Sequence, residues 1–502
     1  MAIEPVFEKI TCTKENKSVK ERVKVECRSE IESDGVKKII NLSSSADIIS
    51  AEIHDGKILY KGKIIYFVCY EDVEGDVRKS EYGVEFNGET DIPCDVMDYK
   101  IDASALVEKT DVNLSTPKFS VTSYVLINFD VKCCEKVEAL IGGNGLIVKS
   151  EELESLESLG TRETLYEIEE EFEIATEVKE VINHKAEAVI TSCLAGVGCI
   201  IVDGEAYLSL LLLKDGENKE IIKQQKTFPF RVEIECEEAM PSNLCTASVK
   251  VSDFKTDILV SGGEGMSVAE AKLKLRFIAE AFDGKKHQVS VDAFNLEENV
   301  DLERLDARLQ IPCDVMCDTV EIKEKANVEE FEDGARVCAT TSEIVEIVSV
   351  EQVENVLTVN GILSLNVVMN GADGRFFSRK ASVPFECRVN APSEEKYIKI
   401  NAVIKSSTAK ILSSQELEVC AELTLAFSFC KEKNYSVISS ITPCGKKQRE
   451  SSAISVYIAS ENESLWGLAK RLNVCPDELL SSNKELQFPL TGEERIVVFR
   501  QK

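Results

Sequence analysis

Residues 58–78 read I-L-Y-K-G-K-I-I-Y-F-V-C-Y-E-D-V-E-G-D-V-R, and two later stretches of the chain follow the same pattern. Residues 199–219 read C-I-I-V-D-G-E-A-Y-L-S-L-L-L-L-K-D-G-E-N-K, and residues 356–375 read V-L-T-V-N-G-I-L-S-L-N-V-V-M-N-G-A-D-G-R. Each stretch has an apolar run, a glycine, a second apolar run and a polar turn. Short apolar runs bounded by turn residues predict β-strands. The sequence therefore predicts the same β-rich unit three times.

A glycine in each copy is followed at a nearly constant interval by a phenylalanine. The glycines are Gly62, Gly204 and Gly361, and the phenylalanines are Phe86, Phe230 and Phe385. Because glycine is common at tight turns, we expect each of these glycines to form a turn between two strands. Each copy ends with a further alternating segment, at residues 119–131, 272–280 and 417–429. Alternation of this kind predicts half-buried antiparallel strands.

The long interval between copies indicates duplicated domains, because the repeats of a solenoid recur every ~20–50 residues. We predict a mainly β fold with three tandem units at residues 1–148, 149–302 and 303–445. The second unit opens with an acidic run at residues 151–173, which reads either as a solvated linker or as a short helix lined by leucines. We favour the linker, because charge runs of this kind are usually solvated. A basic stretch at residues 443–449 is expected to be a flexible tether to a last, small domain.

That last domain, residues 450–502, has the pattern strand, helix, helix, strand. Residues 456–459 alternate as a short strand, and Ser464 is placed to cap a helix with apolar residues at helical spacing. Pro476 suits the first position of a second helix. Residues 496–499 form the closing strand.

This order of elements resembles the LysM domain, a small βααβ fold. The matching residues are Ser464, Leu465, Trp466, Ala469, Leu479, Asn483, Leu490, Gly492, Ile496, Val497 and Val498. The usual Gly-Asp before the first helix is replaced by Asn462-Glu463, in the loop that glycan-binding LysM modules usually keep. A domain this small needs a large apolar anchor, so Trp466 is expected to be its core aromatic. The expected LysM core is Trp466, Ala469, Leu472, Leu479 and Ile496.

The LysM resemblance also implies a ligand groove between the loop entering the first helix and the loop preceding the last strand. The expected partner-binding residues are Ser460, Glu461, Asn462, Glu463, Ser464, Leu465, Leu486, Gln487, Phe488, Pro489, Leu490 and Thr491. Lysines and arginines nearly balance the acids within the module, so the net charge of −30 resides in the β-rich units. A near-neutral module on an acidic body suits a protein partner.

Composition narrows the class of function further. A net charge of −30 and a pI near 4.7 disfavour binding to nucleic-acid phosphates and to anionic lipid. The N-terminal residues show no secretory signal, and the 18 cysteines form no CxxC pair, so we expect reduced thiols in a cytosol and no metal site. P-loop, GxSxG and HExxH motifs are absent from the sequence. We therefore expect no catalytic residues, no cofactor and no enzyme activity.

Three such units followed by a LysM module resemble the SPOCS-domain sporulation proteins of clostridia, and the resemblance covers essentially the whole chain. It implies a scaffold for spore coat and envelope assembly in the mother-cell cytoplasm, at the outer surface of the forespore. It further implies that the LysM module binds the coat ATPase known as stage IV sporulation protein A, with other coat proteins as further partners. An alternative stays open: a peptidoglycan (N-acetylglucosamine) binding protein, or the targeting subunit of a cell-wall hydrolase.

Overall fold

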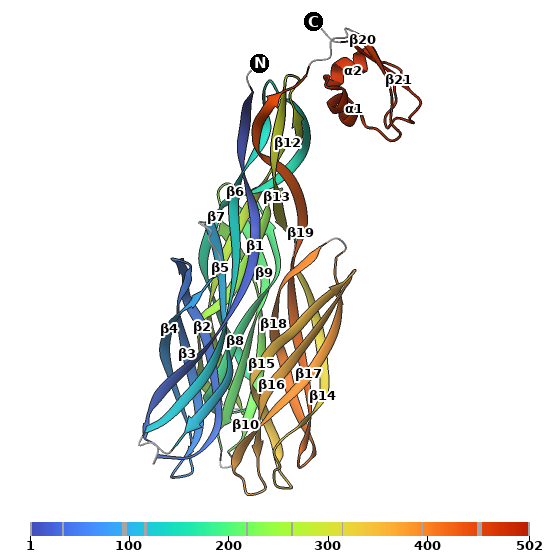
Figure 1. Cartoon of the computed structure of the whole chain (residues 1–502). Coiled ribbons are helices and arrows are strands. Elements are labelled where there is room, and N and C mark those ends of the chain that lie inside the picture. The colour runs from blue at the N-terminus through green and yellow to red at the C-terminus, as the bar shows by residue number, and fades with distance from the viewer. Residues whose placement is uncertain are drawn as a thin grey trace.

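The computed structural model describes residues 3–32, 35–92, 98–114, 118–216, 219–262, 265–313, 315–392, 395–448 and 454–499. It is almost entirely β-strand, with two short helices near the C-terminus (Figure 1). The predicted class, mainly β with a small module of two strands and two helices, is confirmed. Among the helices of the described segments, none is long and apolar enough to cross a membrane.

The three units share one strand order. Unit 1 consists of β1 (Glu4–Glu32), β2 (Val36–His54), β3 (Lys57–Asp72), β4 (Val77–Asp91), β5 (Asp98–Asn113) and β6 (Lys118–Asn144). Unit 2 consists of β7 (Ile147–Ile174), β8 (Val178–Ala195), β9 (Cys199–Lys214), β10 (Ile221–Glu235), β11 (Leu244–Gly262) and β12 (Met266–Phe294). Unit 3 consists of β13 (Glu298–Pro312), β14 (Met316–Asn327), β15 (Arg336–Val353), β16 (Val356–Asn370), β17 (Phe376–Asn390), β18 (Lys396–Ser413) and β19 (Glu416–Lys446).

Each unit is a sandwich of two antiparallel sheets. One sheet is a three-stranded meander: β2-β3-β4, β8-β9-β10 or β15-β16-β17. In the other sheet the last long strand lies between the first and the fifth, as in β1-β6-β5 and β7-β12-β11. In unit 3 the first strand is split into β13 and β14, and both pair with β19. The apolar faces of the two sheets meet to form a separate hydrophobic core in each unit.

The repeated glycines lie inside strands, so the prediction that they form turns is wrong. Gly62 lies in the middle of β3 and is paired in register with Phe86 on β4. A Cβ atom at this position would overlap the Phe86 ring, and the same holds at Gly204 and Gly361 beneath their own phenylalanines. The aromatic ring thus fills the space that the missing side chain leaves, which is how a strand tolerates a glycine.

The long strands extend beyond the sandwiches and form a narrow stalk (Figure 1). β1, β6, β7 and β12 have 27–29 residues, and β19 has 31. Their stalk halves pair as three two-stranded ribbons, with β1 on β6, β7 on β12 and β13 on β19. A small apolar core joins the ribbons and consists of Ile10, Cys12, Val137, Ala139, Leu153, Val289, Ala307 and Val437.

The acidic run at residues 151–173 belongs to β7 and is neither a linker nor a helix. Its glutamates pair with cations on the neighbouring strand β12, as in Glu163–Arg276 at 2.7 Å and Glu167–Lys274 at 3.4 Å. Lys274 lies directly across from Glu167 and Arg276 lies diagonally across from Glu163, and opposite charges in both arrangements stabilise the pairing of two antiparallel strands. The alternative of a leucine-lined helix is also wrong, because Leu153 alternates inward with a strand period and is buried in the stalk.

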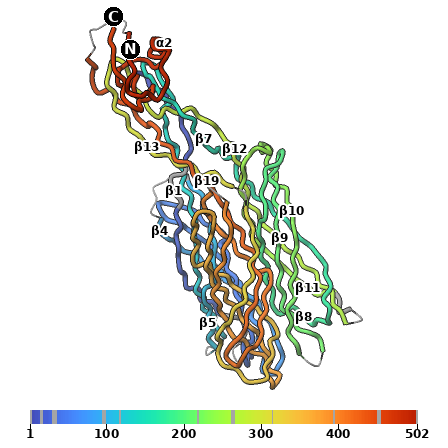
Figure 2. Tube along the Cα trace, turned by 90° about the vertical axis from the view of Figure 1, so that its right-hand side faces the viewer, coloured from blue at the N-terminus to red at the C-terminus, as the bar shows by residue number. Residues whose placement is uncertain are grey.

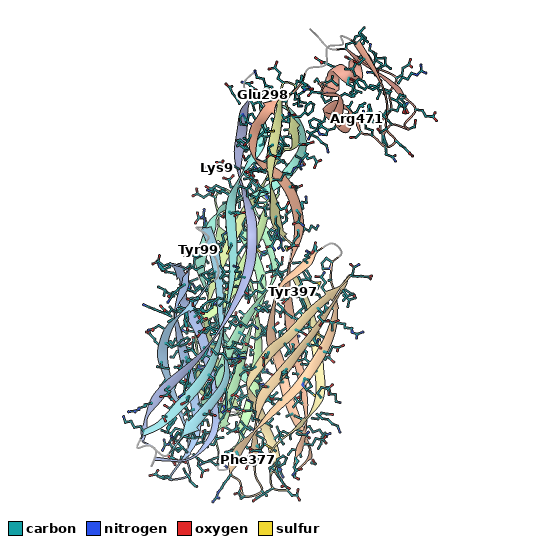
Figure 3. All side chains as sticks on the ribbon, in the orientation of Figure 1. Lys9, Tyr99, Glu298, Phe377, Tyr397 and Arg471 are labelled. Carbon is teal, nitrogen blue, oxygen red and sulfur yellow. The ribbon has the colours of Figure 1, made fainter. Side chains whose placement is uncertain are left out.

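The three units pack side by side (Figure 2) and share an apolar cluster. Equivalent positions of the three meanders, such as Cys69, Leu211 and Val368, lie in one apolar cluster. Phe376 belongs to this cluster, and its neighbour Phe377 lies at the end remote from the stalk (Figure 3). The units are therefore held together at both ends, by this shared apolar cluster at one and by the stalk at the other.

A buried ion pair joins units 2 and 3. Lys223 on β10 pairs with Glu343 on β15, and the two side chains are 10% and 4% exposed. Lys223 Nζ also donates to Thr340 Oγ1 at 3.0 Å and to Ser407 Oγ at 2.8 Å. Burial lowers the pKa of Lys223, whereas the pKa of Glu343 is lowered by the two nearby lysines against the opposing effect of its burial. The pair and its hydrogen bonds thus connect β10 of unit 2 to β15 and β18 of unit 3.

Candidate functional site

The C-terminal module consists of β20 (Ile454–Ile458), α1 (Leu465–Leu472), α2 (Pro476–Ser482) and β21 (Arg495–Phe499), in the predicted order. β20 and β21 pair antiparallel. Ser464 caps α1, because its Oγ accepts the Gly467 N–H at 3.1 Å. Asn473 ends that helix in the left-handed conformation.

The core of the module is aliphatic. The expected residues Ala469, Leu472, Leu479 and Ile496 lie in it, together with Ala459, Leu468, Val474, Leu490 and Val498. Asn483, one of the residues that match the LysM domain, joins α2 to the sheet. Its side chain donates to the Val497 carbonyl at 2.7 Å and accepts the Val497 N–H at 2.8 Å.

Trp466 is not part of this core, and its assignment as the core aromatic is corrected here. The indole Nε1 donates to Asp292 Oδ2 on β12 at 2.7 Å, and the ring lies edge-on to Phe294 at 5.3 Å between centroids. The core face of α1 is already filled by Leu468, Ala469 and Leu472. Position 466 projects from another side of the helix, where it meets the stalk of the β body.

Trp466 belongs to a second stripe along α1. Lys470 and Asn473 follow it at i+4 and i+7, so the three side chains project from the same side of the helix. Lys470 Nζ binds the Asp292 carboxylate at 2.8 Å, and Asn473 Nδ2 donates to the Leu296 carbonyl at 2.7 Å. This spacing is the sequence signal that could have indicated a docking face, which we call the α1 docking face.

The expected tether is largely ordered as well. Residues 443–446 form the end of β19, and Lys447 bridges the body and the module. Its Nζ donates to the Asn295 carbonyl at 2.8 Å and to Asn473 Oδ1 at 2.7 Å. Residue 449 of the predicted tether lies outside the described residues.

Asp292 is the central charge of this contact. Its side chain is 18% exposed and also lies 3.4 Å from an Arg304 nitrogen. Burial alone would raise its pKa, but the hydrogen bonds from Lys470 and Trp466 outweigh burial and lower the pKa of Asp292. The carboxylate therefore stays ionised and serves both donors of the α1 docking face.

The two loops of the expected groove lie side by side and are joined by backbone hydrogen bonds. The Asn462 N–H donates to the Leu490 carbonyl at 2.8 Å, and the Leu490 N–H donates to the Glu463 carbonyl at 3.1 Å. Among the apolar groove residues, Leu490 is buried, and Leu465, Leu486 and Phe488 pack partly buried against the core. The exposed members are Ser460, Glu461, Asn462, Ser464, Gln487, Pro489 and Thr491.

Glu494 occupies the backbone donors next to the groove. Its carboxylate accepts the N–H groups of Thr491, Gly492 and Glu493 at 2.9–3.1 Å. These hydrogen bonds, led by that of Thr491, lower the pKa of Glu494 to about 2. Glu463, which the sequence places where LysM domains usually have Asp, pairs instead with Arg471 at 2.7 Å. The backbone N–H groups of Thr491 and Gly492 and the carboxylate of Glu463 are therefore engaged within the module.

An apolar surface outside the groove was missed by the sequence reasoning. Ile454, Val456 and Ile458 on β20 and Phe499 on β21 are 55–70% exposed and point to the same side of the two-stranded sheet. We call these four residues the β20–β21 face. Its signal was present in the sequence, because residues 454–459 are apolar at almost every position. A two-stranded sheet with helices on one side can bury only one of its faces.

Residues 35–115 and 177–259 match the family model described as SipL, SPOCS domain. These two segments are SPOCS domains. They correspond to β2–β5 of unit 1 and β8–β11 of unit 2, and β15–β18 of unit 3 repeat the same strand order. The two matches are consistent with a SipL-like sporulation protein. No curated protein and no solved structure matches the chain.

The first SPOCS domain contains an acidic cluster at the turn between β3 and β4. Asp72, Glu74 and Asp76 are close enough to share a cation. However, Asp72 Oδ1 accepts two backbone N–H groups of the same turn, and Arg78 pairs with Asp72 at 2.9 Å. Asp76 pairs with Lys219 of unit 2 at 2.8 Å. The carboxylates therefore stabilise the turn and join the first SPOCS domain to the second.

Proposed function

We propose that this SipL-like chain is a non-enzymatic scaffold for spore coat assembly. In this proposal the three β units form an elongated body, and the C-terminal module recruits the coat-basement ATPase, stage IV sporulation protein A, at the forespore surface. The site of action is the mother-cell cytoplasm. The observation that carries the proposal is the placement of the module: its α1 docking face is held by the stalk, while the β20–β21 face and the groove loops remain exposed (Figure 1).

The chemistry of the exposed surface favours a protein partner. Four large apolar side chains on one small sheet form a patch of the kind that marks a protein interface. The adjoining loops add charged and polar side chains, as the rim of an interface does. The partner would therefore bind across both the sheet and the loops.

The same loops are poorly suited to a glycan. Recognition of N-acetylglucosamine in this groove would need free backbone donors, but the N–H groups of Asn462, Leu490, Thr491 and Gly492 are all used within the module. Freeing them would break hydrogen bonds that fix the loops. This argument supports the scaffold against the alternative of a cell-wall binding protein.

The experiment is capture of purified stage IV sporulation protein A by immobilised full-length chain. Val456→Asp in the β20–β21 face and Pro489→Asp in the groove loop should each abolish capture, because both place a charge on the exposed recruiting surface. Val73→Asp is the matched control, since Val73 is 64% exposed in the turn between β3 and β4 of unit 1 and the variant should retain capture.

Circular dichroism of each variant establishes that the chain is folded. Undiminished capture by both folded module variants would contradict the proposed recruiting surface. Loss of capture by the Val73 variant alone would move the binding site to the β body.

A further inference from the structure

The two sheets of each unit meet along a seam at the end nearest the stalk. The seam runs between the end of β2, β8 or β15 and the start of β5, β11 or β18. The same β-bulge precedes it in all three units, at Ile48/Ser50, Ile190/Ser192 and Ile347/Ser349. Counting from this bulge makes Ala51, Cys193 and Val350 equivalent residues.

In unit 1 a tyrosine closes the seam. Tyr99, near the start of β5, donates its hydroxyl to the Ile53 carbonyl at 2.9 Å and accepts the Ile53 N–H at 3.2 Å. In unit 3 a glutamine closes it: Gln352 donates to the Glu395 carbonyl at 2.6 Å and accepts the Tyr397 N–H at 2.9 Å. Tyr99 and Tyr397 mark these two seams, below the stalk, in Figure 3.

In unit 2 a pair of thiols occupies the seam. Cys193 Sγ on β8 lies 3.3 Å from Cys245 Sγ on β11. Cys245 pairs with Ala281 on β12, which is the position that Tyr99 takes against β6 in unit 1. Cys193 is 5% exposed, whereas Cys245 is partly exposed. Tyr99 of unit 1 and Gln352 of unit 3 thus have a counterpart in unit 2, the Cys193–Cys245 pair, that is able to form a covalent bond.

We infer that Cys193 and Cys245 are a redox modification site and form a reversible disulfide that latches unit 2. The two sulfur atoms are already in contact, and small rotations of the side chains bring them to the ~2.05 Å of a disulfide bond. The bond joins the sheet β8-β9-β10 to the sheet β7-β12-β11, so it holds the sandwich closed where the other units use hydrogen bonds.

A low-molecular-weight disulfide such as glutathione disulfide supplies the oxidant. The Cys245 thiolate, being partly exposed, attacks one sulfur of the oxidant and releases one glutathione thiolate. Cys193 then loses its proton, attacks the Cys245 sulfur of the mixed disulfide and releases the second glutathione. Overall two protein thiols lose two protons and two electrons, one protein S–S bond forms, and the S–S bond of the oxidant is reduced to two thiols.

The test is incubation of the full-length chain with glutathione disulfide, followed by non-reducing peptide mapping by mass spectrometry. We expect a peptide pair joined between Cys193 and Cys245, lighter than the reduced peptides by two hydrogen atoms and separated again by a thiol reductant. The thermal midpoint of the oxidised chain should rise, because the cross-link restricts the unfolded state. Cys245→Ser should lose both effects, while the control Cys387→Ser on β17 should keep them.

Two results would overturn the inference. One is an oxidised chain in which Cys245 remains a stable glutathione adduct with Cys193 still reduced. The other is recovery of both cysteines as reduced thiols at oxidant concentrations that modify other cysteines of the folded chain.

Discussion

Replacing Asp292 with alanine should release the C-terminal module from the stalk. The substitution removes the shared acceptor of Trp466 Nε1 and Lys470 Nζ. A hydrogen bond to a charged group contributes ~1.5–3 kcal/mol. The Lys470 side chain is 42% exposed, so solvent reduces its ion pair to about 1 kcal/mol or less. The loss of ~3 kcal/mol corresponds to a roughly 100-fold shift of the docking equilibrium toward the undocked module.

Fluorescence of Trp466 measures this shift directly, because Trp466 is the single tryptophan of the chain. In the wild-type protein its ring packs against Phe294 at the stalk, so undocking should move its emission to longer wavelength and lower its anisotropy. Asp301→Ala is the matched control, since Asp301 is an exposed acid on β13 of the same stalk. Unchanged emission in Asp292→Ala, or an equal change in the control, would refute the proposed docking contact.

Three further predictions concern the β body. Burial lowers the pKa of His184 to about 4, so between pH 6.5 and 4 the unfolded chain binds a proton that the folded chain does not, and the free energy of unfolding should fall by ~1.4 kcal/mol per pH unit as the pH drops. Urea midpoints should show this fall in the wild type and a flatter response in His184→Phe, and equal slopes in the two proteins would count against a neutral buried histidine. Glu343→Gln should destabilise the body by ~3–5 kcal/mol, because Lys223 is left buried without its counter-charge. Chemical denaturation should show that the double variant Lys223→Met/Glu343→Leu regains most of this stability, whereas no loss in Glu343→Gln would contradict a buried ion pair. Gly62→Val should cost ~1–3 kcal/mol by overlap with Phe86, and the thermal midpoint should recover in part with Phe86→Leu, whereas independent effects of the two changes would argue against their contact.

Local sequence patterns were sufficient for several of the strands and for the order of elements in the small module. The alternation in residues 119–131 and 417–429 predicted strands, because the buried face of an antiparallel strand recurs with period two. The cap at Ser464 and the proline at 476 located the two helices. These features depend on neighbours in sequence, which a single chain displays directly.

The features that were missed depend on partners distant in sequence. Gly62 resembled a turn residue until its pairing with Phe86 was known. The acidic run forms a strand because it pairs with β12, whose lysine and arginine side chains balance its glutamates. Trp466 is large and apolar enough to be a core anchor, and its role at the stalk follows from its contact with Asp292, which lies 174 positions away in the chain. Site residues that make such long-range contacts can be assigned only when the three-dimensional structure is known.

The most direct test of the proposed scaffold is a calorimetric titration of the full-length chain with two ligands in parallel. One ligand is purified stage IV sporulation protein A, and the other is a chito-oligosaccharide of N-acetylglucosamine. The scaffold proposal predicts saturable binding of the ATPase that Val456→Asp removes, and no heat of binding with the oligosaccharide. Saturable binding of the oligosaccharide together with no binding of the ATPase would contradict it and establish the chain as a cell-wall glycan binder.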